Sequence, residues 1–155
     1  MDVNEQIAIT WITEVKKMFV RSELYFGQYN NDIDILAVSI VDDLIWDCEV
    51  KARTGSTNMD EASFADIIKK FNCPERINLI SSLTGNKTEI KKKLIISKKY
   101  FGETEKTINK WKDKFNQNDI EVIYFDTVID DIRNFAVSCS KTTNLVIQTL
   151  KLSSA

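Results

Sequence analysis

The chain has 155 residues, enough for one domain with a sizeable core, and we predict a single domain over residues 1–155. Its 21 basic and 23 acidic residues give a net charge of −2, so bulk charge does not favour a polyanionic partner. There is no histidine, which excludes Ser-His-Asp and Cys-His catalysis and every metal site built on imidazole.

The first half of the chain predicts one helix followed by three strands. Apolar residues recur at helical spacing from Asn4 to about Met18, with Asp2 or Asn4 as the cap. Three segments with strand character follow, and the last two predict a hairpin: Val20–Phe26, Ile33–Ile40 and Leu44–Ala52. The hairpin turn falls at the polar residues 41–43.

The second half alternates helices and strands. The predicted elements are a helix Ser63–Phe71, a strand Lys93–Ser97, a helix Glu103–Asn116, a strand Ile120–Phe125 and a helix Thr127–Ala136. Residues 72–90 extend the helical region ambiguously, and residues 144–152 are apolar without a clear period. This order predicts an α/β fold with a mixed central sheet flanked by helices. The two later strands should pair in parallel through a right-handed crossover.

The cysteines and the hydropathy pattern point to a reducing compartment. Cys48, Cys73 and Cys139 lie far apart with no CxxC spacing, which argues against zinc and against a disulfide framework. No early apolar run resembles a signal peptide, and no apolar stretch approaches membrane-spanning length. We therefore expect a cytoplasmic protein that has no membrane partner.

The predicted hairpin carries an unusual number of charges, in the sequence NDIDILAVSIVDDLIWDCEVKAR at residues 31–53. Residues two apart in a strand share a face, so Glu49 and Lys51 point the same way and Asp34 can converge with them. Two converging carboxylates repel each other unless a cation lies between them. Oxygen ligands favour Mg²⁺ or Mn²⁺, and a nearby lysine can orient water or stabilise charge on a phosphate. This arrangement suits metal-assisted phosphodiester hydrolysis.

The same residues resemble a known family. Asp34 followed by Glu49-Val50-Lys51 is similar to the motif of the PD-(D/E)xK nucleases. The phrases DIDILA and WDCEVKAR resemble restriction-endonuclease-like and Holliday-junction-resolvase-like members. The predicted element order matches the αβββαβ core of that fold over about residues 4–125. The proline that names the motif is absent, since Ile33 precedes Asp34.

The resemblance implies a Mg²⁺- or Mn²⁺-dependent DNA endonuclease. Asp34 and Glu49 would bind the metal, and Lys51 would serve the attacking water. Family members often add a glutamate from the first helix, for which Glu5 is the candidate and Glu14 the alternative. With no separate recognition domain, specificity would come from loops or from a partner protein. A homodimer is expected because one centre cuts one strand at a time, and residues 144–152 are apolar enough to form its interface.

Two other interpretations of the hairpin stay open. Alternating charges at Asp47, Glu49 and Lys51 are also typical of the solvent-facing side of a strand, where ion pairs contribute little. The chain would then be a protein-interaction domain. A catalytically inactive module of the nuclease fold, binding DNA or protein, is the second interpretation. Asp47 itself has no predicted role beyond lying at a solvent-exposed strand end.

Basic residues are concentrated in one region. Residues 86–114 hold ten lysines and four acids, a net charge of +6 in a chain whose total is −2. The predicted nucleic-acid-binding residues are Lys91, Lys92, Lys98, Lys99, Lys106, Lys110 and Lys114. The alternative is an ordinary solvated lysine face. Trp46 and Tyr29 could stack on bases, although Trp46 also suits the core.

Overall fold

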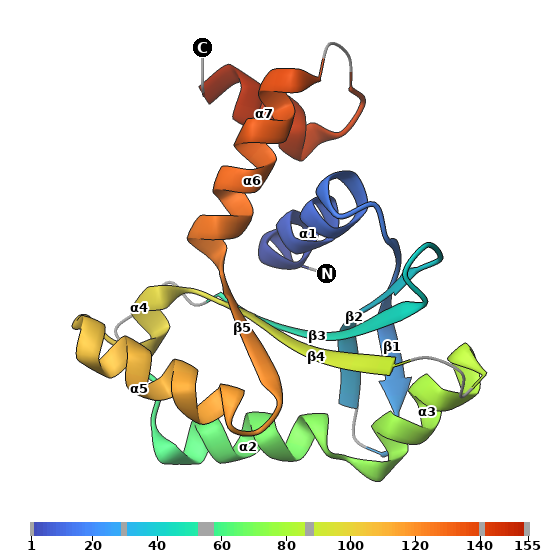
Figure 1. Cartoon of the computed structure of the whole chain (residues 1–155), viewed down its shortest axis with the longest axis vertical. Helices are drawn as coiled ribbons and strands as arrows, with labels where there is room; N and C mark the ends of the chain where they lie inside the picture. The colour runs from blue at the N-terminus through green and yellow to red at the C-terminus, as the bar shows by residue number, and fades with distance from the viewer. Residues whose placement is uncertain (1, 29–30, 53–57, 86–88, 140–141, 154–155) are drawn as a thin grey trace.

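One five-stranded mixed sheet forms the centre of the molecule, with strand order β1-β2-β3-β4-β5 (Figure 1). The computed structural model describes residues 2–28, 31–52, 58–85, 89–139 and 142–153. The strands are β1 (Phe19–Phe26), β2 (Asn31–Ser39), β3 (Leu44–Lys51), β4 (Glu89–Ile96) and β5 (Ile120–Tyr124). β1, β2 and β3 are antiparallel neighbours, whereas β3, β4 and β5 run parallel. The predicted α/β class, the mixed sheet, the β2–β3 hairpin and the parallel β4–β5 pair are confirmed.

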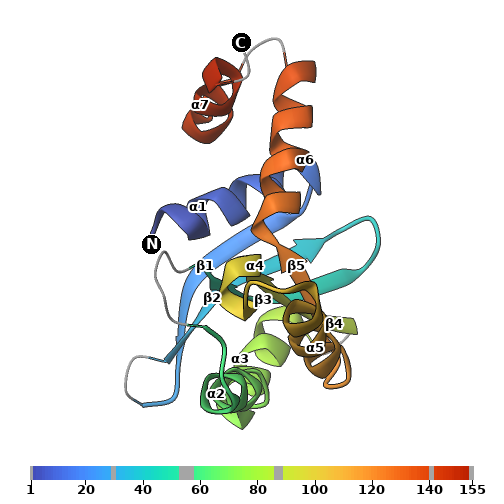
Figure 2. The same cartoon turned by 90° about the vertical axis from the view of Figure 1, so that its left-hand side faces the viewer.

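Helices cover both faces of this sheet. They are α1 (Val3–Thr10), the π-helix η1 (Trp11–Val15), α2 (Glu61–Phe71), α3 (Pro74–Thr84), α4 (Lys98–Phe101), α5 (Glu105–Asn116), α6 (Phe125–Ser138) and α7 (Leu145–Ser153). In Figure 1, α1, α6 and α7 lie on one side of the sheet, and α2, α3 and α5 lie on the other. We call these the α1 side and the α2 side. Figure 2 shows α6 extending away from the sheet beyond α1, with α7 beside it.

The first helix differs from its prediction. It begins as expected, because the Asp2 side chain accepts a hydrogen bond from the backbone N–H of Glu5 at 2.9 Å. Its α-helical part ends at Thr10 rather than near Met18, and a π-helical turn follows. The Thr13 hydroxyl donates to the Ile9 carbonyl at 2.9 Å, a bond that competes with the backbone ladder and widens the turn.

The two segments whose secondary structure was ambiguous in the sequence form helices. Residues 72–90 contain α3, which starts at Pro74, a residue suited to the first helical position, and ends at Gly85 with a φ of 71°. The apolar tail forms α7, and the short α4 was not predicted. β4 starts at Glu89, earlier than predicted, because its first half is mostly charged and lacks the apolar pattern of its second half. Its first three residues pair with β3 and not with β5.

The core divides between the two faces of the sheet. On the α1 side, Cys48 and Val50 of β3 pack with Ile12 and Ile132. On the α2 side, Phe71 packs with residues of β4, α4 and α5 in one cluster, while a second cluster joins β1–β3 to α3. Since side chains of β3 alternate, Asp47, Glu49 and Lys51 point to the α2 side. Among the described residues, no helix has the length and apolar character needed to cross a bilayer.

Candidate functional site

Charged side chains of β2 and β3 gather on the α2 side of the sheet. Asp34 is 7% exposed and Glu49 is fully buried. Asp34 Oδ2 accepts a hydrogen bond from the backbone N–H of Val50 at 2.7 Å, which holds this carboxylate against β3. Lys51 Nζ lies 3.5 Å from Glu49 Oε2. The structure therefore brings Asp34, Glu49 and Lys51 together, as the hairpin register requires, while their chemical roles stay a prediction.

Lys70 of α2 places its ammonium at the centre of this acidic group. Its Nζ lies 2.8 Å from Glu49 Oε2, 3.5 Å from Asp32 Oδ1 and 3.9 Å from Asp34 Oδ1. Sequence reasoning missed Lys70. A signal existed, because Lys70 follows the apolar Ile67 by three residues and so shares the side of the helix that faces the sheet. We call Asp32, Asp34, Glu49, Lys51 and Lys70 the acidic cluster.

Arg76 of α3 is fully buried beneath the acidic cluster. Its Nη1 lies 2.6 Å from Glu49 Oε1, and its Nε lies 3.0 Å from Asp47 Oδ2. The guanidinium carbon lies 4.8 Å from the centroid of the Phe71 ring. The sequence carried no local signal for Arg76, because residues 72–90 were ambiguous. Its role depends on where α3 packs.

Two expectations about β3 are wrong. Asp47 was expected at a solvent-exposed strand end, but it is 1% exposed and pairs with Arg76. The solvent-facing interpretation of the strand also fails, since Glu49 is fully buried. Helices α2 and α3 cover this face. They supply Lys70 and Arg76, whose positive charges offset the free-energy cost of burying the carboxylates.

Burial and neighbouring charges shift the pKa values of Asp34 and Glu49 in opposite directions. Burial and the charge of Glu49 raise the pKa of Asp34 to about 6. Burial alone would raise the pKa of Glu49, but Arg76, Lys70 and Lys51 outweigh it, so this pKa falls below its ordinary value. Burial opposes the charge of Lys70, yet Glu49 and Asp34 raise its pKa. At neutral pH, Glu49 is ionised and Lys70 is protonated.

Glu5, the predicted helix glutamate, lies near the edge of the acidic cluster. The Asn4 amide donates to the Ala52 carbonyl at 3.4 Å, which ties the start of α1 to the end of β3. Burial and the charge of Asp2 raise the pKa of Glu5, and the charge of Asp32 contributes. The catalytic role of Glu5 stays a prediction.

The alternative helix glutamate, Glu14, lies in the π-helical turn η1. The two candidates stand at opposite ends of the first helical segment, and the contact between Asn4 and Ala52 fixes its starting end beside β3. Glu5 is therefore the better placed of the two for a site on the hairpin.

The fit of a divalent cation depends on Lys70. The described part of the chain contains no group of three or more Cys, Asp or Glu residues positioned to hold a metal ion. Both carboxylate oxygens of Glu49 are bonded, one to Arg76 and one to Lys70. The chemistry of the donors nevertheless suits a hard cation, because the side chains around the ammonium offer carboxylate oxygens. If the ammonium withdrew, Asp34 and Glu49 would face a common cation position, with Asp32 beside them.

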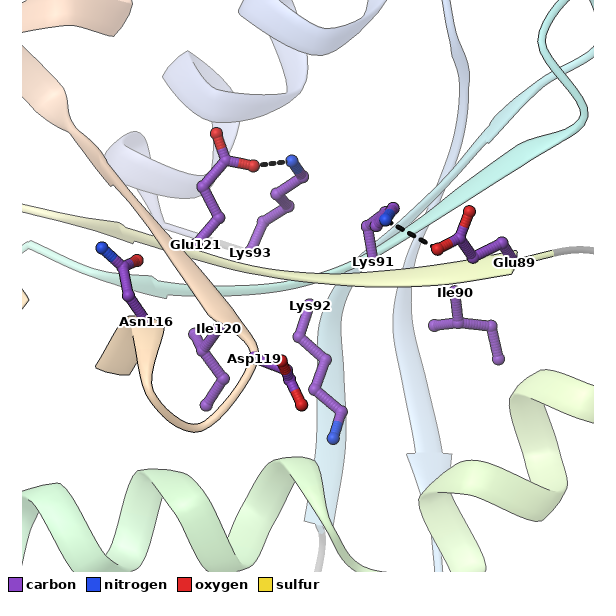
Figure 3. Close-up of a pocket in the computed structure, with 9 residues that line it drawn as sticks. All are labelled: Glu89, Ile90, Lys91, Lys92, Lys93, Asn116, Asp119, Ile120 and Glu121. Atoms are coloured by element: carbon purple, nitrogen blue, oxygen red, sulfur yellow. Dashed lines mark hydrogen bonds and ion pairs between the residues drawn. The ribbon is translucent and has the colours of Figure 1, made fainter. Parts of the chain in front are cut away.

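The predicted nucleic-acid-binding lysines do not share one surface. Figure 3 shows Lys91 and Lys92 projecting to opposite sides of β4. Lys91 Nζ lies 2.6 Å from Glu89, and Lys114 Nζ lies 2.7 Å from Glu61. These acids reduce the positive charge that a phosphate backbone would meet. The remaining predicted lysines Lys98, Lys99, Lys106 and Lys110 are exposed.

A groove of about 570 Å³ lies beside the first half of β4, near the start of β5 (Figure 3). Its charged lining consists of Lys91, Lys92, Lys93, Glu89, Asp119 and Glu121. The three bases and three acids cancel, so this groove has no net attraction for a polyanion. Of the predicted stacking residues, Trp46 is half-buried on the α1 side, and Tyr29 lies outside the described residues.

Comparisons of the chain with protein-family models, with curated proteins and with solved structures found no match. The fold defines an α/β protein with a five-stranded mixed sheet. Its acidic cluster is built from one β-hairpin and the helix α2, with α3 beneath it. A function for this chain therefore has to be argued from the geometry of these side chains.

Proposed function

We propose that this protein is a Mg²⁺- or Mn²⁺-dependent DNA endonuclease with a restriction-endonuclease-like core of the PD-(D/E)xK type. The observation that carries the proposal is the convergence of Asp34, Glu49 and Lys51 on one side of the β2–β3 hairpin. The chain order of α1, β1, β2, β3, α2 and β4 also supports the proposal, because it is the order of an αβββαβ core. Glu5 is retained as the proposed helix glutamate.

Each side chain has a chemical task in this proposal. Asp34 and Glu49 would hold the divalent cation, which when bound supplies Lewis-acid stabilisation of charge on a phosphate. The Lys51 side chain is 33% exposed, so its ammonium can reach a phosphate oxygen or a water molecule outside the cluster. Arg76 donates a hydrogen bond to Glu49 Oε1 and so holds this carboxylate in position. Lys70 is 24% exposed, and its flexible stem gives the ammonium a route toward solvent.

The proposed partners follow from the single small site. DNA is the proposed substrate, in a cytoplasmic setting, with specificity from loops or from a separate partner protein. A homodimer would place two centres on two strands. Leu145 and Leu152 of α7 are 76% and 80% exposed, which supports an apolar interface at this helix.

A second candidate is a catalytically inactive module of the same fold that binds DNA or protein. The observation that favours it is the Lys70 ammonium, which lies 2.8 Å from Glu49 where the nuclease would need a metal. In this candidate the lysine is the permanent counter-ion of the buried carboxylates. The acidic cluster would then stabilise the fold and carry out no hydrolysis.

A cleavage panel separates the two candidates. Purified full-length chain is incubated with labelled duplex, branched and single-stranded DNA and with RNA, in Mg²⁺, Mn²⁺ or EDTA. The variants are Lys51→Ala and Asp34→Asn, with the exposed Lys69→Ala of the same helix as Lys70 as the control. Metal-dependent cleavage that disappears in the first two variants and persists in the control supports the nuclease. Binding of DNA without cleavage on any substrate supports the inactive module, and absence of both DNA and metal binding rejects the nuclease.

A further inference from the structure

The Lys70 ammonium is shared unequally among three carboxylates. Its Nζ lies 2.8 Å from Glu49 Oε2, 3.5 Å from Asp32 Oδ1 and 3.9 Å from Asp34 Oδ1. The first distance is that of a hydrogen bond, and the other two exceed the usual length of an N–H···O bond. Lys70 thus bonds Glu49 in the structure and has Asp32 as its next nearest acceptor.

The two acceptors, Glu49 and Asp32, differ in burial. The Glu49 side chain is fully buried, whereas the Asp32 side chain is 35% exposed. Asp32 lies two residues before Asp34 in β2, so both side chains share the α2 side of the strand. The stem of a lysine is flexible, and its ammonium can turn any of three donors toward an acceptor. A rotation of Lys70 from Glu49 to Asp32 would therefore move the ammonium outward and keep it beside a carboxylate.

The position of the ammonium conflicts with a divalent cation on Glu49. Arg76 Nη1 already lies 2.6 Å from Oε1 of this carboxylate, so Oε2 is the oxygen that a metal would take. Because Mg²⁺ holds oxygen ligands at about 2.0–2.1 Å, an ion on Oε2 would lie within about 5 Å of Lys70 Nζ. Two positive charges at that distance repel each other strongly in a partly buried site. Lys70 therefore has to leave Glu49 when this oxygen binds a metal.

The charges of these side chains can be matched one by one. Asp34 and Glu49 together offer two negative charges, which a divalent cation balances. The ammonium of Lys70 then needs one further carboxylate. Asp32 carries that charge and is already in ion-pair contact with Lys70. With Lys70 on Asp32, both the ammonium and the ion would have their counter-charges.

We propose that Lys70 is a positioning residue with two positions: it bonds Glu49 in the metal-free protein, and it bonds Asp32 when Asp34 and Glu49 hold a divalent cation. In the first position, its ammonium neutralises a buried carboxylate that would otherwise destabilise the fold. Asp32 is accordingly the acceptor for Lys70 and not a ligand of the metal. This role rests on the proposed nuclease site and gives that site a resting state.

Calorimetric titration of the full-length chain with MnCl₂, in the absence of DNA, tests the proposal through a double-mutant cycle. Lys70→Met removes the competing ammonium and should tighten Mn²⁺ binding about tenfold. Asp32→Asn removes the acceptor for the displaced ammonium, so it should weaken Mn²⁺ binding about fivefold to tenfold in the parent. In the Lys70→Met background there is no ammonium to accept, and Asp32→Asn should change the affinity by about twofold or less.

Two exposed residues of α2 supply matched controls. Lys69→Met and Asp66→Asn make the same chemical changes outside the acidic cluster, and each should leave the Mn²⁺ affinity within about twofold of the parent. Thermal melts in EDTA confirm that each variant is folded. If Lys70→Met does not fold, Asp32→Asn still tests the proposal, because its side chain is partly exposed and its loss is tolerated more easily.

The outcomes separate this role of Lys70 from the nuclease site itself. Equal Mn²⁺ affinity in the parent and in Lys70→Met overturns the role and leaves the metal site intact. An effect of Asp32→Asn that is equal in both backgrounds also overturns it, because Asp32 would then be a metal ligand. Unchanged affinity in Asp32→Asn does the same. Absence of Mn²⁺ binding at millimolar concentration in both the parent and Lys70→Met rejects the proposed metal site, and the role of Lys70 falls with it.

Discussion

The ammonium of Lys70 lies 2.8 Å from Glu49 Oε2 and contributes the central cation of the acidic cluster. The same oxygen receives Lys51 at 3.5 Å, while the other oxygen of Glu49 is bonded to Arg76. A fully buried carboxylate is thus neutralised by three side chains from β3, α2 and α3. Whether a metal displaces one of them distinguishes the nuclease from the inactive module.

Replacing Lys70 with methionine tests that displacement. The change removes the ammonium and leaves Asp34 and Glu49 with less positive charge between them. In EDTA, we expect the free energy of unfolding to fall by about 2 kcal/mol, because a charge-assisted hydrogen bond of a buried carboxylate is lost. Mg²⁺ should restore part of the loss, as measured by urea denaturation with and without the metal. Equal stability of Lys70→Met in Mg²⁺ and EDTA would contradict metal binding at the cluster.

Arg76 should be a major contributor to stability. The variant Arg76→Met keeps much of the side-chain volume but leaves Asp47 and Glu49 without their buried partner. Breaking such a pair costs about 3–5 kcal/mol of unfolding free energy. The matched control is Arg133→Met, whose side chain is 50% exposed and pairs weakly with Asp130, so its effect should be within about 0.5 kcal/mol. Chemical denaturation of both variants measures the difference, and a loss below about 1 kcal/mol in Arg76→Met would refute this role.

Asp34 should make stability depend on pH in a defined direction. Its pKa is raised from 3.8 to about 6 in the folded chain, so the folded state holds a proton that the unfolded state releases. The contribution of Asp34 to stability is therefore present below about pH 4 and is lost as the pH rises toward 6. The loss amounts to at most about 3 kcal/mol.

The variant Asp34→Asn isolates that effect. Because asparagine does not ionise, the variant should gain stability relative to the parent between about pH 4 and pH 6 and keep the gain at neutral pH. Denaturation curves at a series of pH values measure it. The exposed Asp66→Asn in α2 is the control, and its difference from the parent should stay constant across the series. A constant difference for Asp34→Asn as well would show that its pKa is not raised.

Lys51 should affect cleavage far more than folding. Its side chain is 33% exposed and forms one ion pair at 3.5 Å, so Lys51→Ala should change the unfolding free energy by less than about 1 kcal/mol. If the chain is a nuclease, the single-turnover cleavage rate should fall by about a hundredfold or more, because an ammonium positioned near the phosphate is lost. A cleavage rate equal to that of the parent would remove Lys51 from the mechanism.

The hairpin that carries the site could be predicted because the residues that define its strands and turn lie close together in the sequence. In a strand, the side-chain period of two determines that Glu49 and Lys51 share a face, and the short turn at residues 41–43 sets the antiparallel pairing that brings Asp34 beside them. The alternation of β3, the helical periodicity of α2 and α5 and the lack of histidine are all visible in the sequence. These features alone determined the α/β class and three members of the acidic cluster.

The cations that complete the cluster could not be predicted in this way. Lys70 lies 21 residues and Arg76 lies 27 residues from Glu49 along the chain, so their contacts depend on how α2 and α3 pack on the sheet. Local periodicity determines which face a side chain occupies, but only tertiary packing decides which distant charge is desolvated beside it. For this protein, that packing made Asp47 a buried partner of Arg76 and made Lys70 the counter-ion of Glu49.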